Sequence, residues 1–165
     1  MKNLKSIALT IFALTVLILP ISAQTGVLSK PVNAVISNYL SVKNALAGND
    51  GDAASAKAKL LLASLNDLPL KNLTAGQNAL IAKLEYDSRH ISEVNRVAHQ
   101  REHFASLSDN LYTLVKSLKL NQQTLYRQYC SMTKKYFMSE SDKGRDPYMG
   151  MANCSKVTET IAAAK

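Results

Sequence analysis

Two cysteines with methionines close by are the residues of this chain best suited to chemistry. Cys130 and Cys154 are the only cysteines in the sequence, and both lie in its last third. Met132 follows the first cysteine by two residues, and Met149 and Met151 shortly precede the second. Thiolate and thioether sulfurs are the ligands that a soft metal ion such as Cu(I) prefers. The sulfur clusters therefore predict a soft-metal site, with Cu(I) as the expected ion and zinc as the less favoured one.

The same cysteines also allow a disulfide. In an exported protein, two cysteines are more often bonded to each other than to a metal, because the compartment is oxidising. A bond between Cys130 and Cys154 would contribute about 3 kcal/mol to stability in the chain-entropy model. From the residues alone, the crosslink and the ligand pair both remain open. A change in redox state would convert one into the other.

Two histidines are further candidate ligands. His99 and His103 are four residues apart in a predicted helix, so both imidazoles project from one face. Neutral imidazole is the commonest metal ligand, and this pair would complete a mixed sulfur and nitrogen site. The alternative is that both are ordinary surface histidines. His90 lies roughly on the opposite face from His99 by helical phase, so the predicted site does not include it.

The five-residue segment from His99 to His103 also matches the His-x-x-Glu-His pattern of inverzincin peptidases. Such an enzyme needs a third zinc ligand, and the glutamates downstream are Glu140 and Glu159, in a tail with no sign of a second lobe. A five-residue pattern with two free positions is weak evidence. A zinc metallopeptidase is therefore the least favoured alternative. No catalytic residue is predicted, and we expect a protein that is not an enzyme.

The first 23 residues have the order of a secretory signal peptide. Two lysines precede an apolar run over 7–19, and Ala23-Gln24 is a suitable cleavage site. The apolar run is short for a membrane anchor, which needs about 20 residues. We therefore expect a periplasmic or secreted protein that is not embedded in a membrane. Its mature part, 24–165, has the size of a single domain.

Charge and composition narrow the classes of function. The formal net charge is +8, but the basic residues are dispersed and form no patch interleaved with aromatic residues. Nucleic acid is therefore not an expected partner. Tryptophan is absent, and the sequence has only six glycines and four prolines. This composition favours helices over a β-sandwich or barrel.

Hydrophobic periodicity predicts the elements that must position these side chains. Apolar residues recur at helical spacing in four stretches, namely 29–48, 53–64, 75–88 and 91–118. A capping-box pattern at Thr74 and Gln77 starts the third stretch, and the fourth is expected to kink or break near 99–103. After residue 120 the periodicity ends and loop-forming residues dominate. The predicted fold is all-α, a bundle of about four helices with an irregular C-terminal segment packed on it.

Four short motifs lie in order along 91–161. They run from His99 to Ser108, from Tyr126 to Met132, from Asp146 to Gly150 and from Met151 to Cys154. In this order the stretch resembles a bacterial domain of unknown function that occurs in exported proteins and in CusB-type copper and silver efflux adaptor subunits. The family has Cys-Pro-Met where this chain has Cys130-Ser131-Met132. The family also has more residues between the glycine of the third motif, Gly150 here, and the second cysteine. Of Met149 and Met151, the spacing to Cys154 favours Met151 as the counterpart of the family's methionine.

The resemblance implies a mostly helical domain tied to heavy-metal handling, with the cysteines and methionines as contact residues. A periplasmic efflux or metal-delivery protein is the partner that it suggests. Together with the residues themselves, it predicts an exported soft-metal-binding protein that binds, buffers or delivers its ion. The rival interpretation is a disulfide-locked structural or protein-interaction domain without a metal.

Overall fold

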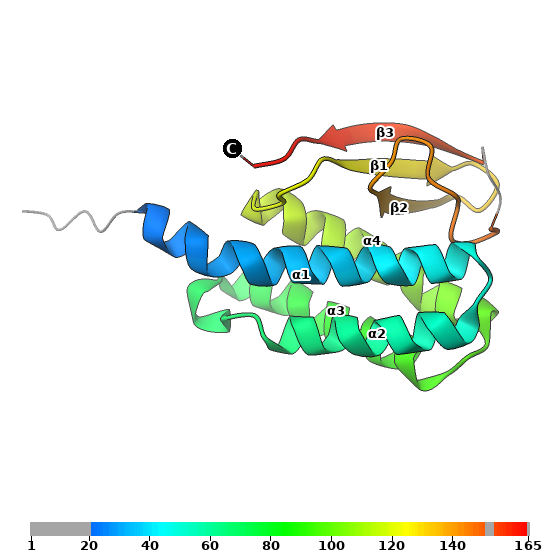
Figure 1. Cartoon of the computed structure of the whole chain (residues 1–165), viewed down its shortest axis with the longest axis horizontal. Helices are drawn as coiled ribbons and strands as arrows, with labels where there is room; N and C mark the ends of the chain where they lie inside the picture. The colour runs from blue at the N-terminus through cyan, green and yellow to red at the C-terminus, as the bar shows by residue number, and fades with distance from the viewer. Residues whose placement is uncertain (1–20, 151–153, 165) are drawn as a thin grey trace, which may run out of the picture.

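The computed structural model describes residues 21–150 and 154–164 (Figure 1). Within them the chain forms four α-helices, a short 3-10 turn (Leu70–Asn72) and three β-strands. The helices are α1 (Ile21–Ala47), α2 (Gly51–Asn66), α3 (Ala75–Glu93) and α4 (Val97–Leu118), and the strands are β1 (Leu125–Cys130), β2 (Lys135–Ser139) and β3 (Ser155–Ile161). The predicted signal peptide, 1–23, lies almost wholly outside the described residues. No helix in the described part is long and apolar enough to cross a bilayer.

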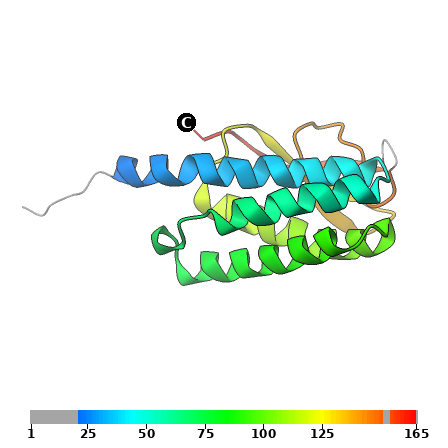
Figure 2. The same ribbon diagram turned by 60° about the horizontal axis from the view of Figure 1, so that its bottom comes forward.

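The helices form a bundle that carries the sheet on one side. Helix α2 packs against α1 and α3, and α3 packs against α4. The sheet lies on the α1 and α4 side of the bundle, away from α2 and α3, and β2 contacts both α1 and α4 (Figures 1 and 2). The prediction of a four-helix bundle is confirmed. The α1 and α4 pair is therefore the layer that separates the sheet from the other two helices.

The C-terminal segment corrects the all-α prediction. Instead of an irregular segment, it forms a three-stranded antiparallel sheet in the order β2-β1-β3. Strands β1 and β2 are neighbours in sequence, but β1 also pairs with β3, which follows a long loop. The tyrosines, threonines and valine of these strands suit a pleated surface. Burial does not alternate regularly along the short β1 and β2 strands, so they lack the two-residue periodicity that indicates a strand in a sequence.

The boundary between α3 and α4 lies a few residues later than the one expected between 88 and 91, and α4 is continuous through 99–103, where a kink or break was expected. Helix α3 ends at Glu93, and Val94 and Arg96 are extended before α4 begins. The buried Gln100 side chain closes this corner, since its Nε2 donates hydrogen bonds to three backbone carbonyls. These belong to Gly51 (2.9 Å), Ile91 (3.2 Å) and Val94 (2.7 Å). One amide side chain thus satisfies carbonyls that a helix end leaves without partners.

A chain of buried aromatic side chains joins the bundle to the sheet. The Tyr39 ring of α1 stacks on Phe104 of α4, with ring centroids 5.2 Å apart. Phe104 contacts Tyr148 at 5.9 Å, and Tyr148 contacts Phe137 of β2 at 6.4 Å. The Tyr39 hydroxyl also accepts a hydrogen bond from the backbone N–H of Met138 at 3.0 Å. Through Tyr148, the loop before β3 is therefore anchored to α4 and to β2.

A candidate metal site at the Cys130–Cys154 disulfide

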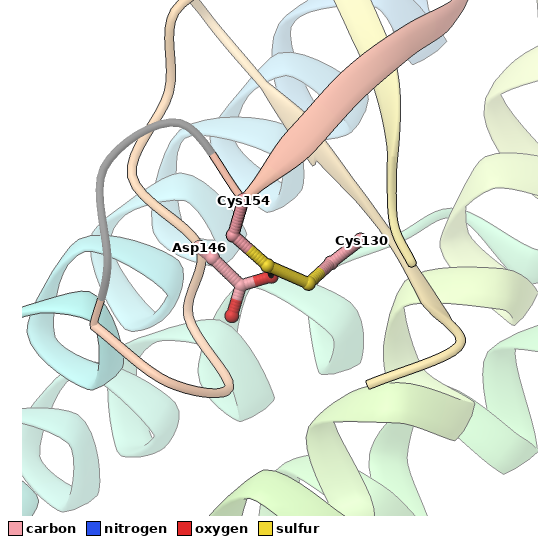
Figure 3. A group of neighbouring side chains, drawn as sticks. All are labelled: Cys130, Asp146 and Cys154. Atoms are coloured by element: carbon pink, nitrogen blue, oxygen red, sulfur yellow. Dashed lines mark hydrogen bonds between the residues drawn. A yellow bond between two sulfur atoms is a disulfide. The ribbon is translucent and has the colours of Figure 1, made fainter. Parts of the chain in front are cut away.

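Cys130 and Cys154 are bonded to each other in this structure (Figure 3). Cys130 ends β1 and pairs with Ser155, the first residue of β3, so the antiparallel register brings Cys154 beside it. The two Cα atoms are 5.4 Å apart, within the usual range for a disulfide. Cys130 is fully buried and Cys154 is partly buried. Of the two interpretations left open by the sequence, the structure contains the crosslink.

A carboxylate completes the group. Asp146 lies in the loop before β3, and one of its oxygens and the two Sγ atoms all lie within 4.8 Å of one another (Figure 3). The Sγ atom of Cys154 is 3.9 Å from Asp146 Oδ2. The Asp146 residue is fully buried. Asp146 is not among the ligands predicted from the sequence, although its position two residues before Tyr148, in a motif that carried the resemblance, was an available signal.

Local hydrogen bonds fix the orientation of Asp146. Its Oδ1 atom accepts from the backbone N–H groups of Tyr148 (2.7 Å) and Met149 (2.8 Å). The Gly150 N–H donates to the Asp146 carbonyl at 2.9 Å and closes the turn. Gly150 has a positive φ of 67°, and a Cβ there would lie 2.9 Å from the Ala47 carbonyl oxygen. These contacts occupy Oδ1 and turn Oδ2 toward the sulfur atoms.

Two basic side chains surround this group. Arg101 of α4 donates from Nε to the Pro147 carbonyl (2.7 Å) and from Nη2 to the Leu46 carbonyl (2.9 Å), so it ties the loop to the end of α1. Lys135 stands opposite Cys130 in the β1–β2 ladder. Burial raises the pKa of Asp146, although backbone N–H groups and the charges of Arg101 and Lys135 act against the rise. The carboxyl is thus held in a place where its ionised form is disfavoured.

The methionines of the predicted site are found at its edge or outside the described residues. Met132 follows Cys130 in the β1–β2 turn and is 62% exposed. Met149 is 42% exposed, and its backbone N–H donates a hydrogen bond to Asp146 Oδ1. Met151 lies in 151–153, outside the part of the chain that the structure describes. Because Met132 and Met149 are exposed, packing in the core does not explain why these positions are methionine.

His99 and His103 are not brought to the cysteines. Both lie roughly 160–200° around the axis of α4 from Arg101, at about 100° per residue. Because Arg101 faces the Asp146 loop, the two histidines face the other way, toward α3. There they meet His90, whose ring centroid is 4.7 Å from that of His103. The structure thus separates the predicted mixed site into a sulfur cluster and a histidine cluster.

Comparison with known proteins identifies a family for this chain. Residues 35–123, more than half of the chain, match the family described as "Protein of unknown function (DUF3347)". The chain belongs to this family. The prediction that the chain contains a domain of unknown function is therefore confirmed. No curated protein and no solved structure matches the chain significantly.

The DUF3347 match covers a different part of the chain from the stretch 91–161 that carried the resemblance. It begins inside α1 and ends just before β1, so it spans the helical bundle and overlaps that stretch only over 91–123. The disulfide and Asp146 lie beyond the matched residues. The family match therefore supports the helical bundle and does not extend to the sulfur site.

The two free positions of the His-x-x-Glu-His pattern are occupied by residues with structural roles in this DUF3347 bundle. Gln100 closes the α3–α4 corner, and Arg101 binds the Asp146 loop. The two downstream glutamates are engaged elsewhere. Glu140 accepts hydrogen bonds from Lys43 (2.8 Å) and Asn44 (3.0 Å) of α1, and Glu159 contacts Tyr112 and Lys116 of α4. Among the described contacts, neither glutamate is brought to the histidines.

Replacing Asp146 by asparagine should stabilise the disulfide-bonded protein at neutral pH. Asparagine keeps an oxygen for the Tyr148 and Met149 N–H groups but removes the buried charge. Because the folded pKa is raised, the folded protein binds the proton more tightly than the unfolded chain. Wild-type stability therefore falls as pH rises through that raised pKa. We expect the melting temperature of D146N to exceed that of the wild type at pH 7.

The increase in melting temperature of D146N over the wild type should shrink as pH falls toward about 4, because the wild-type carboxyl is then increasingly protonated and uncharged. Thermal unfolding between pH 4 and pH 8 measures this difference. Asp142→Asn serves as the matched control, since Asp142 lies in the same segment but is exposed. A D146N gain that is equal at all pH values would contradict the argument.

Proposed function

We propose that this DUF3347 protein is an exported soft-metal-binding protein, in which reduced Cys130 and Cys154 bind Cu(I) beside Asp146. The observation that supports the proposal is the buried Asp146 carboxylate, whose Oδ2 faces the Cys154 sulfur at 3.9 Å. A disulfide that only crosslinks two strands needs no carboxylate against it. Retaining a group that costs stability is typical of a functional site.

The bond between the sulfurs and the binding of a metal exclude each other. An external dithiol would supply two electrons and two protons, break the S–S bond and leave two thiols, while the dithiol itself becomes a disulfide. Cu(I) then replaces the two thiol protons, which are released to solvent. The positive charge of Lys135, which stands opposite Cys130 in the β1–β2 ladder, favours the thiolate form of that cysteine and offsets the negative charge of a copper dithiolate.

Ligand type supports Cu(I) as the ion. Thiolates and thioethers are soft ligands, and the exposed Met132 and Met149 are available thioethers close to the two cysteines in sequence. Two thiolates with a carboxylate would also accept zinc, which takes cysteine and aspartate ligands. Zinc is therefore the less favoured ion, and the sulfur-rich neighbourhood of the pair is the reason for the preference.

Reversible oxidation suits a protein that binds, buffers or delivers metal in a periplasmic or secreted setting. The oxidised pair cannot bind the ion, and the reduced pair can, so the redox state would decide whether the metal is held. A metal-delivery or efflux protein would donate or receive it. The rival function is a disulfide-locked structural or protein-interaction domain, which is favoured by the complete burial of Cys130 at the end of β1.

A chelator competition under anaerobic conditions tests the proposal. The reduced chain, 24–165, freed of reductant, should hold one Cu(I) per molecule against bathocuproine disulfonate, and the oxidised chain should hold none. Cys130→Ser combined with Cys154→Ser should abolish binding. Asp146→Asn should weaken it about tenfold or more, the loss expected for a group next to a metal. Asp142→Asn, in the same segment but exposed, should leave it unchanged.

Failure of the reduced, folded wild type to retain Cu(I) would leave the disulfide-locked domain as the function. Circular dichroism of the reduced protein is needed to show that the helical bundle persists. Stronger retention of Zn²⁺ than of Cu(I) in the same reduced protein would instead show that the assignment of the ion is wrong. Binding that survives in the double serine variant would move the site away from the cysteines.

A further inference from the structure

Three histidines gather where α3 lies against α4. The rings of His90 and His103 stack with centroids 4.7 Å apart, and His99 meets His103 edge-on at 5.0 Å. His90 comes from the last turn of α3, and the other two come from the first two turns of α4. The side chains are 35%, 31% and 19% exposed for His90, His99 and His103. All three histidines of the chain therefore lie in one accessible cluster.

The Nδ1 atom of each ring faces a carboxylate. His103 Nδ1 is 3.2 Å from Oδ1 of the buried Asp87, and His99 Nδ1 is 3.3 Å from Glu102 Oε2. His90 Nδ1 lies 3.9 Å from Glu93 Oε2. Of these three contacts, the one at His103 is a hydrogen bond, and it favours the tautomer that carries the proton on Nδ1 and leaves Nε2 unprotonated. Metal-binding histidines almost always have the arrangement seen at His103, in which the second ring nitrogen donates to a carboxylate or carbonyl.

We propose that His90, His99 and His103 bind a borderline divalent transition ion, with Zn²⁺ as the expected one, through their Nε2 atoms. Two histidines four residues apart on a helix are a common pair of zinc ligands, and three imidazoles with an open fourth position make a known zinc ligand set. Asp87, Glu93 and Glu102 supply the negative charge that balances the ion. The soft-metal cluster of the proposed function contains sulfur ligands, so the two sites differ in the class of ion that they select.

The rings must turn before they can share an ion, because among the described residues the side chains whose ligand atoms already converge are Cys130, Asp146 and Cys154, and the histidines are not among them. His90 and His103 are stacked with an interplanar angle of 12°, so their Nε2 atoms must turn toward each other about χ2. Partial exposure leaves room for this turn at His90 and His99. His103 is the least exposed of the three and is held by Asp87, so it is the fixed ligand around which the others close. Asp87 is a positioning residue, because it acts through His103.

The histidine site does not depend on the cysteines. Arg101 and the two histidines of α4 lie on opposite faces of the helix, and Arg101 contacts the loop that contains Asp146. The bundle thus stands between the two clusters. Failure of the Cu(I) proposal would leave the histidine site untouched, and the reverse also applies.

Zn²⁺ titration of the oxidised protein tests this inference, because its thiols are blocked. At pH 7.5 in a buffer that does not bind metals, calorimetry should show one Zn²⁺ per chain. His90→Ala, His99→Ala and His103→Ala should each weaken binding at least tenfold. Asp87→Asn should weaken it about tenfold while the Co²⁺ absorption spectrum of the site keeps its form, as expected for a residue outside the ligand shell. Cys130→Ser with Cys154→Ser should bind Zn²⁺ as the wild type does.

Glu85→Gln is the matched control for Asp87→Asn, since Glu85 is a carboxylate of α3 that is not paired with a histidine in the described contacts. Thermal unfolding of each variant shows that the fold is intact. The inference is overturned if the wild type binds no Zn²⁺, if the His99 and His103 double variant binds it equally well, or if binding appears only after reduction of the disulfide.

Discussion

Removing the disulfide, by changing both Cys130 and Cys154 to serine, is expected to lower the free energy of unfolding by about 3 kcal/mol. The bond joins residues that are 24 positions apart, so it restricts a sizeable loop of the unfolded chain. It also ties β3 to β1 at the end of their ladder, where Cys130 pairs with Ser155. Urea unfolding, read by circular dichroism, measures the loss.

Reduction of the wild type provides the second arm of this experiment. Adding dithiothreitol should lower the urea midpoint of the wild type toward that of the double serine variant and leave the variant itself unchanged. Serine at the buried position 130 adds a small cost of its own, which the reduced wild type does not carry. Wild-type protein whose midpoint is insensitive to the reductant would show that this bond does not stabilise the fold.

Phe104→Ala should be the most damaging single core substitution, with a loss of about 4 kcal/mol. The Phe104 side chain has no exposed surface and contacts Tyr39 of α1 on one side and Tyr148 of the loop on the other. Truncation would open a cavity between α1, α4 and the sheet, where no neighbour can collapse without moving the aromatic chain. The melting temperature should fall by roughly 10 °C or more.

Phe104→Leu is the matched control, because it keeps most of the apolar volume and should cost clearly less than the alanine substitution. The alanine variant should also loosen the Asp146 loop, since Tyr148 loses one of its ring contacts. Hydrogen exchange at the Tyr148 and Met149 amides, which bind Asp146 Oδ1, would detect that effect. A loss below about 1 kcal/mol would mean that the aromatic chain is not the link between bundle and sheet.

Local sequence patterns were sufficient for most of the helical bundle. The capping box predicted at Thr74 is present, with Gln77 N–H donating to its hydroxyl at 3.2 Å and the Gln77 side chain accepting from Thr74 N–H at 2.9 Å. Apolar periodicity also placed most of the buried faces, because an amphipathic helix must turn one stripe toward the core, although Leu60 in the second apolar stretch is 52% exposed. The boundary between the third and fourth helices was placed a few residues too early, since the contacts that stabilise it come from Gln100 across the corner and not from a local breaker residue.

His90 shows why a phase argument failed in this corner. The prediction applied a single helical phase from His90 to His99, which put these two residues on opposite faces. The extended residues between α3 and α4 reverse the chain direction, so α3 and α4 lie side by side and their histidines meet. A shift of a few residues in a helix boundary thus decided which ligands share a site.

The sequence by itself determined the residue types available for metal chemistry and the helices that make up the scaffold, because both are local properties of the chain. Only the tertiary structure decided that Cys130 and Cys154 are bonded, that Asp146 lies against them and that the histidines form a separate cluster. The reason is physical. Strand pairing between β1 and β3, and the packing of α4 between the sheet and α3, bring together residues that are far apart in sequence.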